Sequence, residues 1–295
     1  MITIDPKSVK TGKFHGHMLS AIAPRPIAFA STIDKNGKQN LSPYSFFNAF
    51  GSNPPTLIFS PARRVRDNTI KHTLENVYEV PEVVINVVTY DMVQQTSLSS
   101  CEYPKDVSEF TKAGFTPLES NLIKPMRVSE SPVQFECRVK DVIETGMDGG
   151  AGNLIICEVL LMHINEKVLN EEGRIDPHLI DLVGRCGGNW YTRASGAALF
   201  QVEKPSMNLG IGIDALPAHI RNSDILSGND LGQLGNLESL PDDSTLRSYH
   251  SREEVKKLTD TLKENVDDSG YYLAAKELIK AGRADEALML LQILS

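Results

Sequence analysis

The densest group of cationic residues in the chain lies between residues 63 and 73. Its sequence is Arg63-Arg64-Val-Arg66-Asp-Asn-Thr69-Ile-Lys71-His72-Thr73. Arginine can hold a phosphate through two parallel hydrogen bonds, lysine adds a point charge, and a helix that begins nearby would add amide donors. The group therefore predicts a phosphate site, although a charged loop that merely faces water is an equally good interpretation.

Hydroxyl and amide side chains lie at the ends of two apolar segments that precede this group. The first runs from Pro24 to Thr32 and, after a turn, the second runs from Asn40 to Asn48. A flavin needs a flat apolar slot, hydrogen-bond donors along one edge of its rings, and a charged or hydroxyl-rich pocket for its phosphate. The two segments offer all of these except most of the positive charge, which the residues after them supply.

The composition is that of an ordinary globular protein. Of the 295 residues 41% are hydrophobic and 23% are charged, and the formal net charge is −8, so we expect neither a nucleic-acid nor a membrane partner. The first residues lack the features of a signal peptide and no run is long enough to span a membrane, so we expect a cytoplasmic protein. Because the four cysteines form no Cys-x-x-Cys pair and His15-Gly-His17 has no carboxylate partner, we expect no metal site.

Short apolar runs separated by turn residues dominate the first two thirds of the chain, as is typical of strands. Residues 133–139 alternate most clearly, with apolar side chains on one face and Gln134, Glu136 and Arg138 on the other. Residues 133–145 and 153–165 flank a glycine-rich segment and predict an antiparallel hairpin. Other strands are expected at 27–32, 56–60 and 82–88, and short helices at 68–78, 90–98 and 107–113. This order predicts a barrel or sandwich rather than a Rossmann domain.

The composition changes after Ala197. Residues 206–243 are rich in Gly, Asn, Pro and Leu without a sustained period, so we expect an extension or linker at 201–249. Helix signals dominate residues 250–295: Ser251 can cap a helix, a second helix would end at Gly282, and a third would follow it. We therefore divide the chain into a domain at 1–200, an extension at 201–249, and a helical appendage at 250–295 that packs on the first domain.

The order of these motifs resembles the flavin reductase-like family, whose members have an FMN-binding split barrel. The matching series is Asn40-Leu-Ser-Pro-Tyr-Ser45, Asn53-Pro-Pro55, a strand that ends at Ser60, Lys71-His-Thr73 followed by Asn76, and Gly187-Gly188 with Tyr191. The resemblance covers about residues 13–200, and the ordered series carries it rather than any single motif. It implies a mainly β fold, a Greek-key split β-barrel with short helices and a C-terminal helical extension, and a homodimer with the flavin between its subunits.

The resemblance also implies the binding residues. Ser31 and Thr32 would lie near the ribityl chain or the phosphate, and the ring system would lie along the segment at residues 40–45. The phosphate would bind Lys71 and Thr73, with help from Arg66 or Arg25, although the family often has Lys-Asp-Thr at this point. The cofactor-binding residues that we predict are Arg25, Ser31, Thr32, Asn40, Ser42, Pro43, Tyr44, Ser45, Ser60, Arg66, Lys71 and Thr73.

The activity implied by the resemblance is hydride transfer from NADH or NADPH to FMN, with FAD as a possible replacement. Reduced flavin would then serve an oxygenase or another electron-acceptor protein. The nicotinamide need only stack against flavin N5, so no acid or base is obligatory. His163, toward the end of an apolar run, could contact the nicotinamide or be a hydrogen-bonded structural residue.

Two other functions stay open at this point. The first is a flavin-binding electron carrier without NAD(P)H activity of its own, in which the C-terminal helices dock a partner. The second is a split-barrel protein that binds a haem or a pyridoxal-type phosphate.

Overall fold

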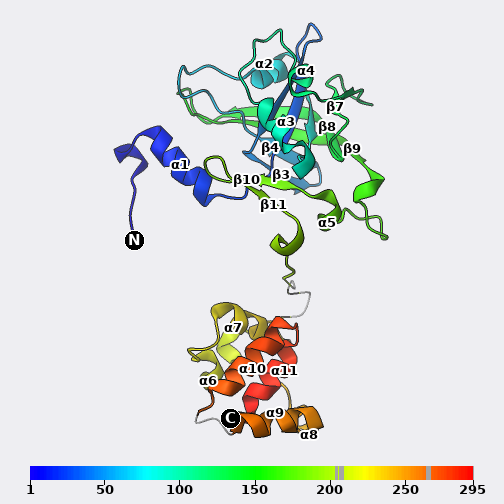
Figure 1. Cartoon of the computed structure of the whole chain (residues 1–295). Helices are drawn as coiled ribbons and strands as arrows, with labels where there is room; N and C mark the ends of the chain where they lie inside the picture. Colours follow the sequence, from blue (N-terminus) through cyan, green and yellow to red (C-terminus); the bar gives the residue numbers. More distant parts are fainter. Residues whose placement is uncertain (203–204, 206–208, 264–266, 295) are drawn as a thin grey trace. The chain divides into compact units, whose positions relative to one another are not determined.

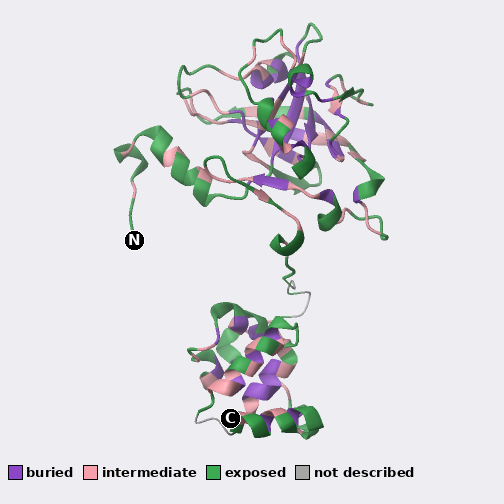
Figure 2. Cartoon of the chain, in the orientation of Figure 1, coloured by how far each residue is buried: buried purple, intermediate pink, exposed green. Residues whose placement is uncertain are grey.

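The computed structural model divides the chain into two compact units, residues Met1–Phe200 and Gln201–Ser295. The structure describes every residue except 203–204, 206–208, 264–266 and 295. The first unit holds all the described strands, and the second contains helices (Figure 1). Each unit has buried residues of its own (Figure 2). In the described parts of the chain, no helix is long and apolar enough to cross a membrane.

The first unit is built on a seven-stranded antiparallel sheet with the order β2-β1-β5-β8-β9-β4-β3. Its strands are β1 Ala28–Ile33, β2 Gln39–Tyr44, β3 Phe47–Ser52, β4 Pro55–Phe59, β5 Glu82–Asn86, β8 Val133–Glu144 and β9 Asn153–Ile164. Two smaller sheets pair β6 Pro117–Leu118 with β7 Arg127–Val128, and β10 Val183–Arg185 with β11 Tyr191–Arg193. The edge strands β2 and β3 are consecutive in the chain, as in a barrel that stays open between its two edges.

Short helices and apolar side chains cover both faces of this sheet. The helices of the first unit are α1 Thr11–Ala21, α2 His72–Glu79, α3 Val93–Leu98, α4 Glu109–Ala113 and α5 Pro177–Ile180. Leu74 of α2 packs with Ala28 and Ala30 of β1 on one face, and Phe110 of α4 packs with Phe29 on the other. Strand β1 is therefore buried along its whole length.

The predicted hairpin of β8 and β9 is confirmed, and part of its polar face is buried as well. Gln134 and Glu136 are buried. The loop at residues 119–126 covers Glu136, which accepts the backbone N–H groups of Asn121 and Leu122, each at 2.7 Å. Gln134 donates to the carbonyls of Val128 and Ser131. The register also shifts after Glu136 and Val139, and such bulges interrupt a strict alternation.

The described residues of the second unit share one apolar core. Its helices are α6 Ala218–Arg221, α7 Gly228–Gly235, α8 Asp243–Ser251, α9 Glu253–Lys263, α10 Ser269–Lys280 and α11 Ala284–Leu291. Ile220 and Leu234 are buried in the same cluster as Ile279 and Leu288. We expected a linker at 201–249 and a separate appendage at 250–295; the structure instead places residues of both segments in one core. Helix α8 ends at Ser251, where we expected a helix to begin.

Candidate functional site

The predicted phosphate-binding residues lie where helix α2 begins. Lys71 is the N-cap residue of α2, and its backbone is extended. The preceding loop folds back on itself, because Arg64 donates to the hydroxyl of Thr69 at 2.9 Å and to the carbonyl of Ile70. These contacts hold the Arg64 guanidinium beside the first turn of α2.

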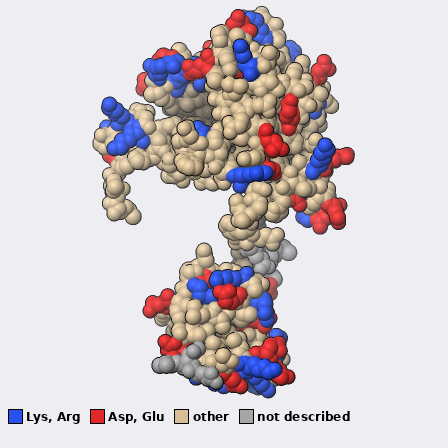
Figure 3. Space-filling model, in the orientation of Figure 1, with Lys and Arg blue, Asp and Glu red and all other residues tan. Residues whose placement is uncertain are grey.

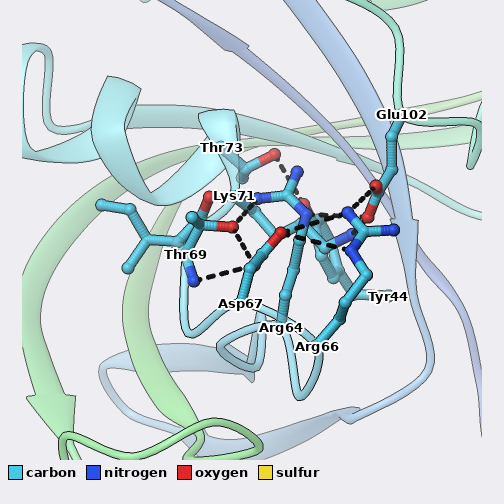
Figure 4. Close-up of polar contacts among 9 residues, drawn as sticks. Tyr44, Arg64, Arg66, Asp67, Thr69, Lys71, Thr73 and Glu102 are labelled. Atoms are coloured by element: carbon cyan, nitrogen blue, oxygen red, sulfur yellow. Dashed lines mark hydrogen bonds and ion pairs between the residues drawn. The ribbon is translucent and has the colours of Figure 1, made fainter.

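Three cationic side chains of this region converge on the carboxylate of Glu102 (Figure 4). Arg64 Nε and Lys71 Nζ lie 2.7 Å and 3.5 Å from Glu102 Oε1, and Arg66 Nη2 lies 2.9 Å from Oε2. We call Arg64, Arg66 and Lys71 the cation cluster. Hydrogen bonds from Arg64 and Arg66 lower the pKa of Glu102 to about 2. Glu102 is therefore ionised at neutral pH, and the cluster already binds one oxyanion.

The cation cluster is a local feature. On the face seen in Figure 3, acidic and basic side chains are interspersed. A compact group of three cations can bind one phosphate group, whereas a nucleic-acid backbone would need a longer basic surface.

A second group of polar side chains, adjacent to the cation cluster, is buried. Thr73 Oγ1 accepts hydrogen bonds from Asn40 Nδ2 and from the Tyr44 hydroxyl, each at 2.8 Å, and Thr32 Oγ1 accepts one from Asn76 Nδ2 at 3.1 Å. We call these five residues the buried polar cluster. Burial raises the pKa of Tyr44, so its hydroxyl keeps the proton that it donates. The cluster ties β1, β2 and α2 together.

The structure thus separates residues that we predicted to share one role. Lys71 and Arg66 lie in the cation cluster, together with Arg64, which we did not select. Thr73 is fully buried, and it positions α2 through Asn40 and Tyr44 instead of facing the cations.

Arg25 lies at a third place. It is buried, and its guanidinium donates to the carbonyls of Ile22 and Cys186 at 3.1 Å and 3.2 Å and to Ser45 Oγ at 3.4 Å. No hydrogen bond or ion pair within the described ranges joins it to Lys71. Arg25 therefore anchors the end of α1 and the end of β10 beside β2, at a place separate from the cation cluster.

The remaining predicted residues lie on or next to the sheet. Ser31 is fully buried, and its hydroxyl has no hydrogen-bond partner among the described residues. Ser60 Oγ accepts the backbone N–H of Asn153 at 3.0 Å, which is a structural contact. Ser42, Pro43 and Ser45 are half-buried and lie on or directly after the edge strand β2.

His163 is held by a buried carboxylate. Its Nε2 lies 2.7 Å from Glu136 Oε1. Burial by itself would raise the pKa of Glu136, but the N–H of Asn121, the His163 ring and the N–H of Leu122 outweigh burial, and the pKa lies below its ordinary value. The ring is thus fixed by an ionised partner, and this contact supports the structural interpretation of His163.

A pocket of about 350 Å³ lies between α3 and the β10–β11 pair. It contains two stacked pairs: Arg185 lies 4.7 Å from the centre of the Tyr191 ring, and Arg193 lies 3.8 Å from that of Tyr90. Arg193 also forms an ion pair with Asp181, whereas Arg185 has none in the described structure. We call this the Arg–Tyr pocket. Its aromatic rings and free guanidinium suit a planar ligand that carries an anionic group.

Sequence reasoning missed Glu102 and most of the Arg–Tyr pocket. Glu102 is 31 positions from Lys71, in a loop without a recognisable motif, so no sequence signal connects the two. Tyr191 did belong to the series that we identified, but Tyr90 and Arg185 come from separate segments that only the fold brings together.

A family model described as "Flavin reductase like domain" matches residues 19–183. A protein of Aquifex aeolicus is 36% identical over 186 residues, which are 63% of this chain and 92% of that protein. A protein of Halalkalibacterium halodurans is 31% identical, over 70% of this chain and 97% of that protein. The matched region of the family model ends before the helical unit begins.

Solved structures also resemble this chain over about two thirds of its length. Nitrilotriacetate monooxygenase component B from Bacillus cereus is 28% identical with a TM-score of 0.64, over 68% of this chain and 98% of that one. The 2-nitrobenzoate 2-nitroreductase NbaA of Pseudomonas fluorescens is 25% identical with a TM-score of 0.61, over 70% of this chain and 100% of that one. A Shewanella frigidimarina protein named for its split barrel domain has a TM-score of 0.58 at 23% identity, over 69% and 100%. The predicted split-barrel fold with short helices and C-terminal helices is confirmed.

Proposed function

Because the chain belongs to the flavin reductase-like family and its function is flavin-related redox chemistry, we propose that this oxidoreductase binds FMN and reduces it with NADH or NADPH. The observation that carries the choice of FMN is the cation cluster. A phosphate monoester carries between one and two negative charges near neutral pH, and three converging cations provide both the charge and the donors for it.

The donor set of this chain fits the phosphate of FMN. Arg64, Arg66 and Lys71 already surround an oxyanion in the form of the Glu102 carboxylate, so the same N–H groups would hold a phosphate. The rings would lie along the outer edge of β2, beside Pro43. When bound, FMN supplies the ring system that accepts a hydride at N5.

We propose the Arg–Tyr pocket as the site of NADH or NADPH. Arg185 would bind a phosphate, and the Tyr rings would pack against a base. The backbones of Arg185 and Arg25 are hydrogen-bonded at 2.8 Å and 2.9 Å, and the Arg25 side chain contacts Ser45 at the end of β2. The pocket is thereby linked to the strand along which the rings would lie, and proximity of the two cofactors is the main requirement of the reaction.

We further propose that the protein is a homodimer. Helix α1 has no buried residue, and β3 is exposed at all but its first residue. Phe50 and Trp190 expose 65% and 77% of their surface. Exposed apolar side chains of this size support an interface, and a second copy of the chain is the occupant that we propose.

An electron acceptor is also part of the proposal. One neighbour in structure is a component of a monooxygenase, which supports an oxygenase as the acceptor of electrons from reduced flavin. The competing function is a flavin carrier that a partner reduces, with the helical unit as its docking module. The helical unit has an apolar core of its own, which supports a docking module rather than an unstructured tail.

An anaerobic absorption spectrum tests the activity directly. The protein is loaded with FMN, and NADH or NADPH is added in separate experiments. We expect the flavin bands to bleach within seconds with one of the donors, and Arg185→Gln should raise the donor concentration required without changing FMN affinity. Arg174→Gln, at an exposed residue paired with Glu172, is the matched control. Persistent bands would favour the carrier, a haem or pyridoxal spectrum would identify another ligand, and the absence of bound flavin would refute the proposal.

A further inference from the structure

Glu102 is the only carboxylate among the described residues with an ion pair to all three members of the cation cluster. Asp67 pairs with Arg66 alone, at 3.1 Å. Both oxygens of Glu102 are used, since Oε1 contacts two of the cations and Oε2 contacts the third. The carboxylate therefore lies at the point where the three cationic side chains converge.

A phosphate held by the same side chains would need the positions that Glu102 fills. Arg64 Nε and Lys71 Nζ both face Oε1, and the Nη1 group of Arg64 is already bonded to Thr69 and Ile70. A carboxylate and a phosphate on the same donors would also repel each other. The two anions are therefore alternatives.

We propose that Glu102 is an exchangeable counter-ion of the cation cluster, which occupies the phosphate position in the flavin-free protein and leaves it when the phosphate of a flavin binds. The inference rests on the proposed FMN function and adds a residue that sets how tightly the phosphate is held. Part of the binding free energy of the phosphate is used to displace Glu102, so the apparent affinity is lower than the cluster alone would give.

The surroundings of Glu102 permit such an exchange. It lies in the loop at residues 99–108 between α3 and α4, where the backbone hydrogen bonds of Cys101 and Tyr103 are local. Its side chain is 42% exposed, and those of Arg66, Lys71 and Arg64 are 72%, 29% and 15% exposed. Water therefore reaches the Glu102 carboxylate, and its ion pair with the exposed Arg66 contributes little stability. Among the described residues, one other ion pair ties this loop to α2, between Lys105 and Glu75 at 2.8 Å.

The exchange also connects flavin binding to the conformation of the loop. With Glu102 on the cluster, the loop is pinned to the start of α2. With a phosphate on the cluster, this contact is lost and the loop gains freedom. A flavin that must compete in this way is released more readily, which suits a protein that passes reduced flavin to an acceptor.

The first test compares the affinities of two flavins for Glu102→Gln, a change that keeps the size of the side chain and removes its charge. We expect FMN to bind about 3- to 30-fold more tightly than to the natural chain, while riboflavin, which has no phosphate, binds as before. Flavin fluorescence quenching measures both constants. Glu75→Gln is the matched control, since it removes a carboxylate nearby that pairs with Lys105 and not with the cluster; it should change neither constant.

The second test follows the loop by hydrogen exchange in the natural chain. FMN and inorganic phosphate should each accelerate exchange at residues 99–108, and riboflavin should not. Unchanged or weaker FMN binding to Glu102→Gln, equal tightening in Glu75→Gln, or a loop that ignores phosphate would each overturn the inference. If no flavin binds either protein, the proposed function fails, whereas the phosphate experiment still decides whether Glu102 exchanges.

Discussion

Two groups of polar side chains meet at the first turn of α2, and they differ in nearly every physical respect. Lys71 belongs to an ionic, partly exposed cluster, and Thr73, two residues later, belongs to a neutral cluster that is buried. In the first, Arg64, Arg66 and Lys71 share one carboxylate. In the second, hydroxyl and amide groups bond to each other between β1, β2 and α2.

We infer from the comparison that burial distinguishes the group that we propose to bind phosphate from the group that positions α2. Exposed ion pairs have a small net free energy because water and salt compete with them, so a ligand can replace Glu102. A buried hydroxyl that loses its partner has no water to replace it. Thr73 must therefore keep its contacts, and its role is to hold α2 where Lys71 can act.

The largest expected effect is on stability and tests the buried group. Thr73→Val keeps the shape of the side chain but removes the acceptor of the Tyr44 hydroxyl and the nearer of the two acceptors of the Asn40 amide, so we expect the free energy of unfolding of the first unit to fall by roughly 2–4 kcal/mol. Hydrogen exchange of the β1 amides measures this change. Thr69→Val, at an exposed hydroxyl, is the control, and equal losses in the two variants would remove the distinction between the groups.

A smaller effect, on binding alone, is expected from the exposed group. Lys71→Ala should weaken FMN by roughly 5- to 20-fold, because a charge-assisted contact to the phosphate is lost, while riboflavin affinity and stability stay nearly constant. Lys124→Ala, an exposed lysine on the loop over β8, serves as the control in the same fluorescence titration. A loss of stability comparable to that of Thr73→Val would contradict the assignment of Lys71.

The smallest expected effect is a pH dependence of the competition. The pKa of Glu102 lies at about 2, below the ordinary 4.5, so its ion pairs are complete above that ordinary value and are lost only as the pH falls toward 2. A phosphate ester has a second pKa near 6, so it loses charge between pH 7.5 and 5.5 and FMN affinity should fall roughly 2- to 5-fold. Burial lowers the pKa of His72, which limits any compensating positive charge. Riboflavin should show no such trend. FMN affinity that rises toward pH 5.5 would contradict the expectation that the phosphate loses charge at a higher pH than Glu102 does.

Local sequence patterns predicted much of the barrel. The β8–β9 hairpin was visible because alternation and a glycine-rich turn are short-range signals. Lys71 and Arg66 were selected because they lie in one short run of cationic residues, and their binding of a phosphate stays a prediction. Glu102 was not visible, since its role arises from a contact across 31 positions. The contacts of Thr73 with Asn40 and Tyr44 were not visible either, because they join residues 33 and 29 positions apart.

The helical unit shows the same limit on a larger scale. Leu216, Ile220 and Leu234 lie near or on short helices, so they form no helical period that a sequence window would detect. Their partners, such as Leu288, lie at the far end of the chain. A core assembled from such separate pieces can be recognised only once the fold brings them together.

That shared core determines where the chain tolerates truncation. Removing residues 250–295 would take Ile279 and Leu288 away from Leu216 and Leu234 and leave an apolar surface that favours aggregation. A boundary after Phe200 leaves both cores whole. In evolutionary terms, we expect the helical unit to be gained or lost as a block, because a version without either half would lack the partners of its remaining core residues.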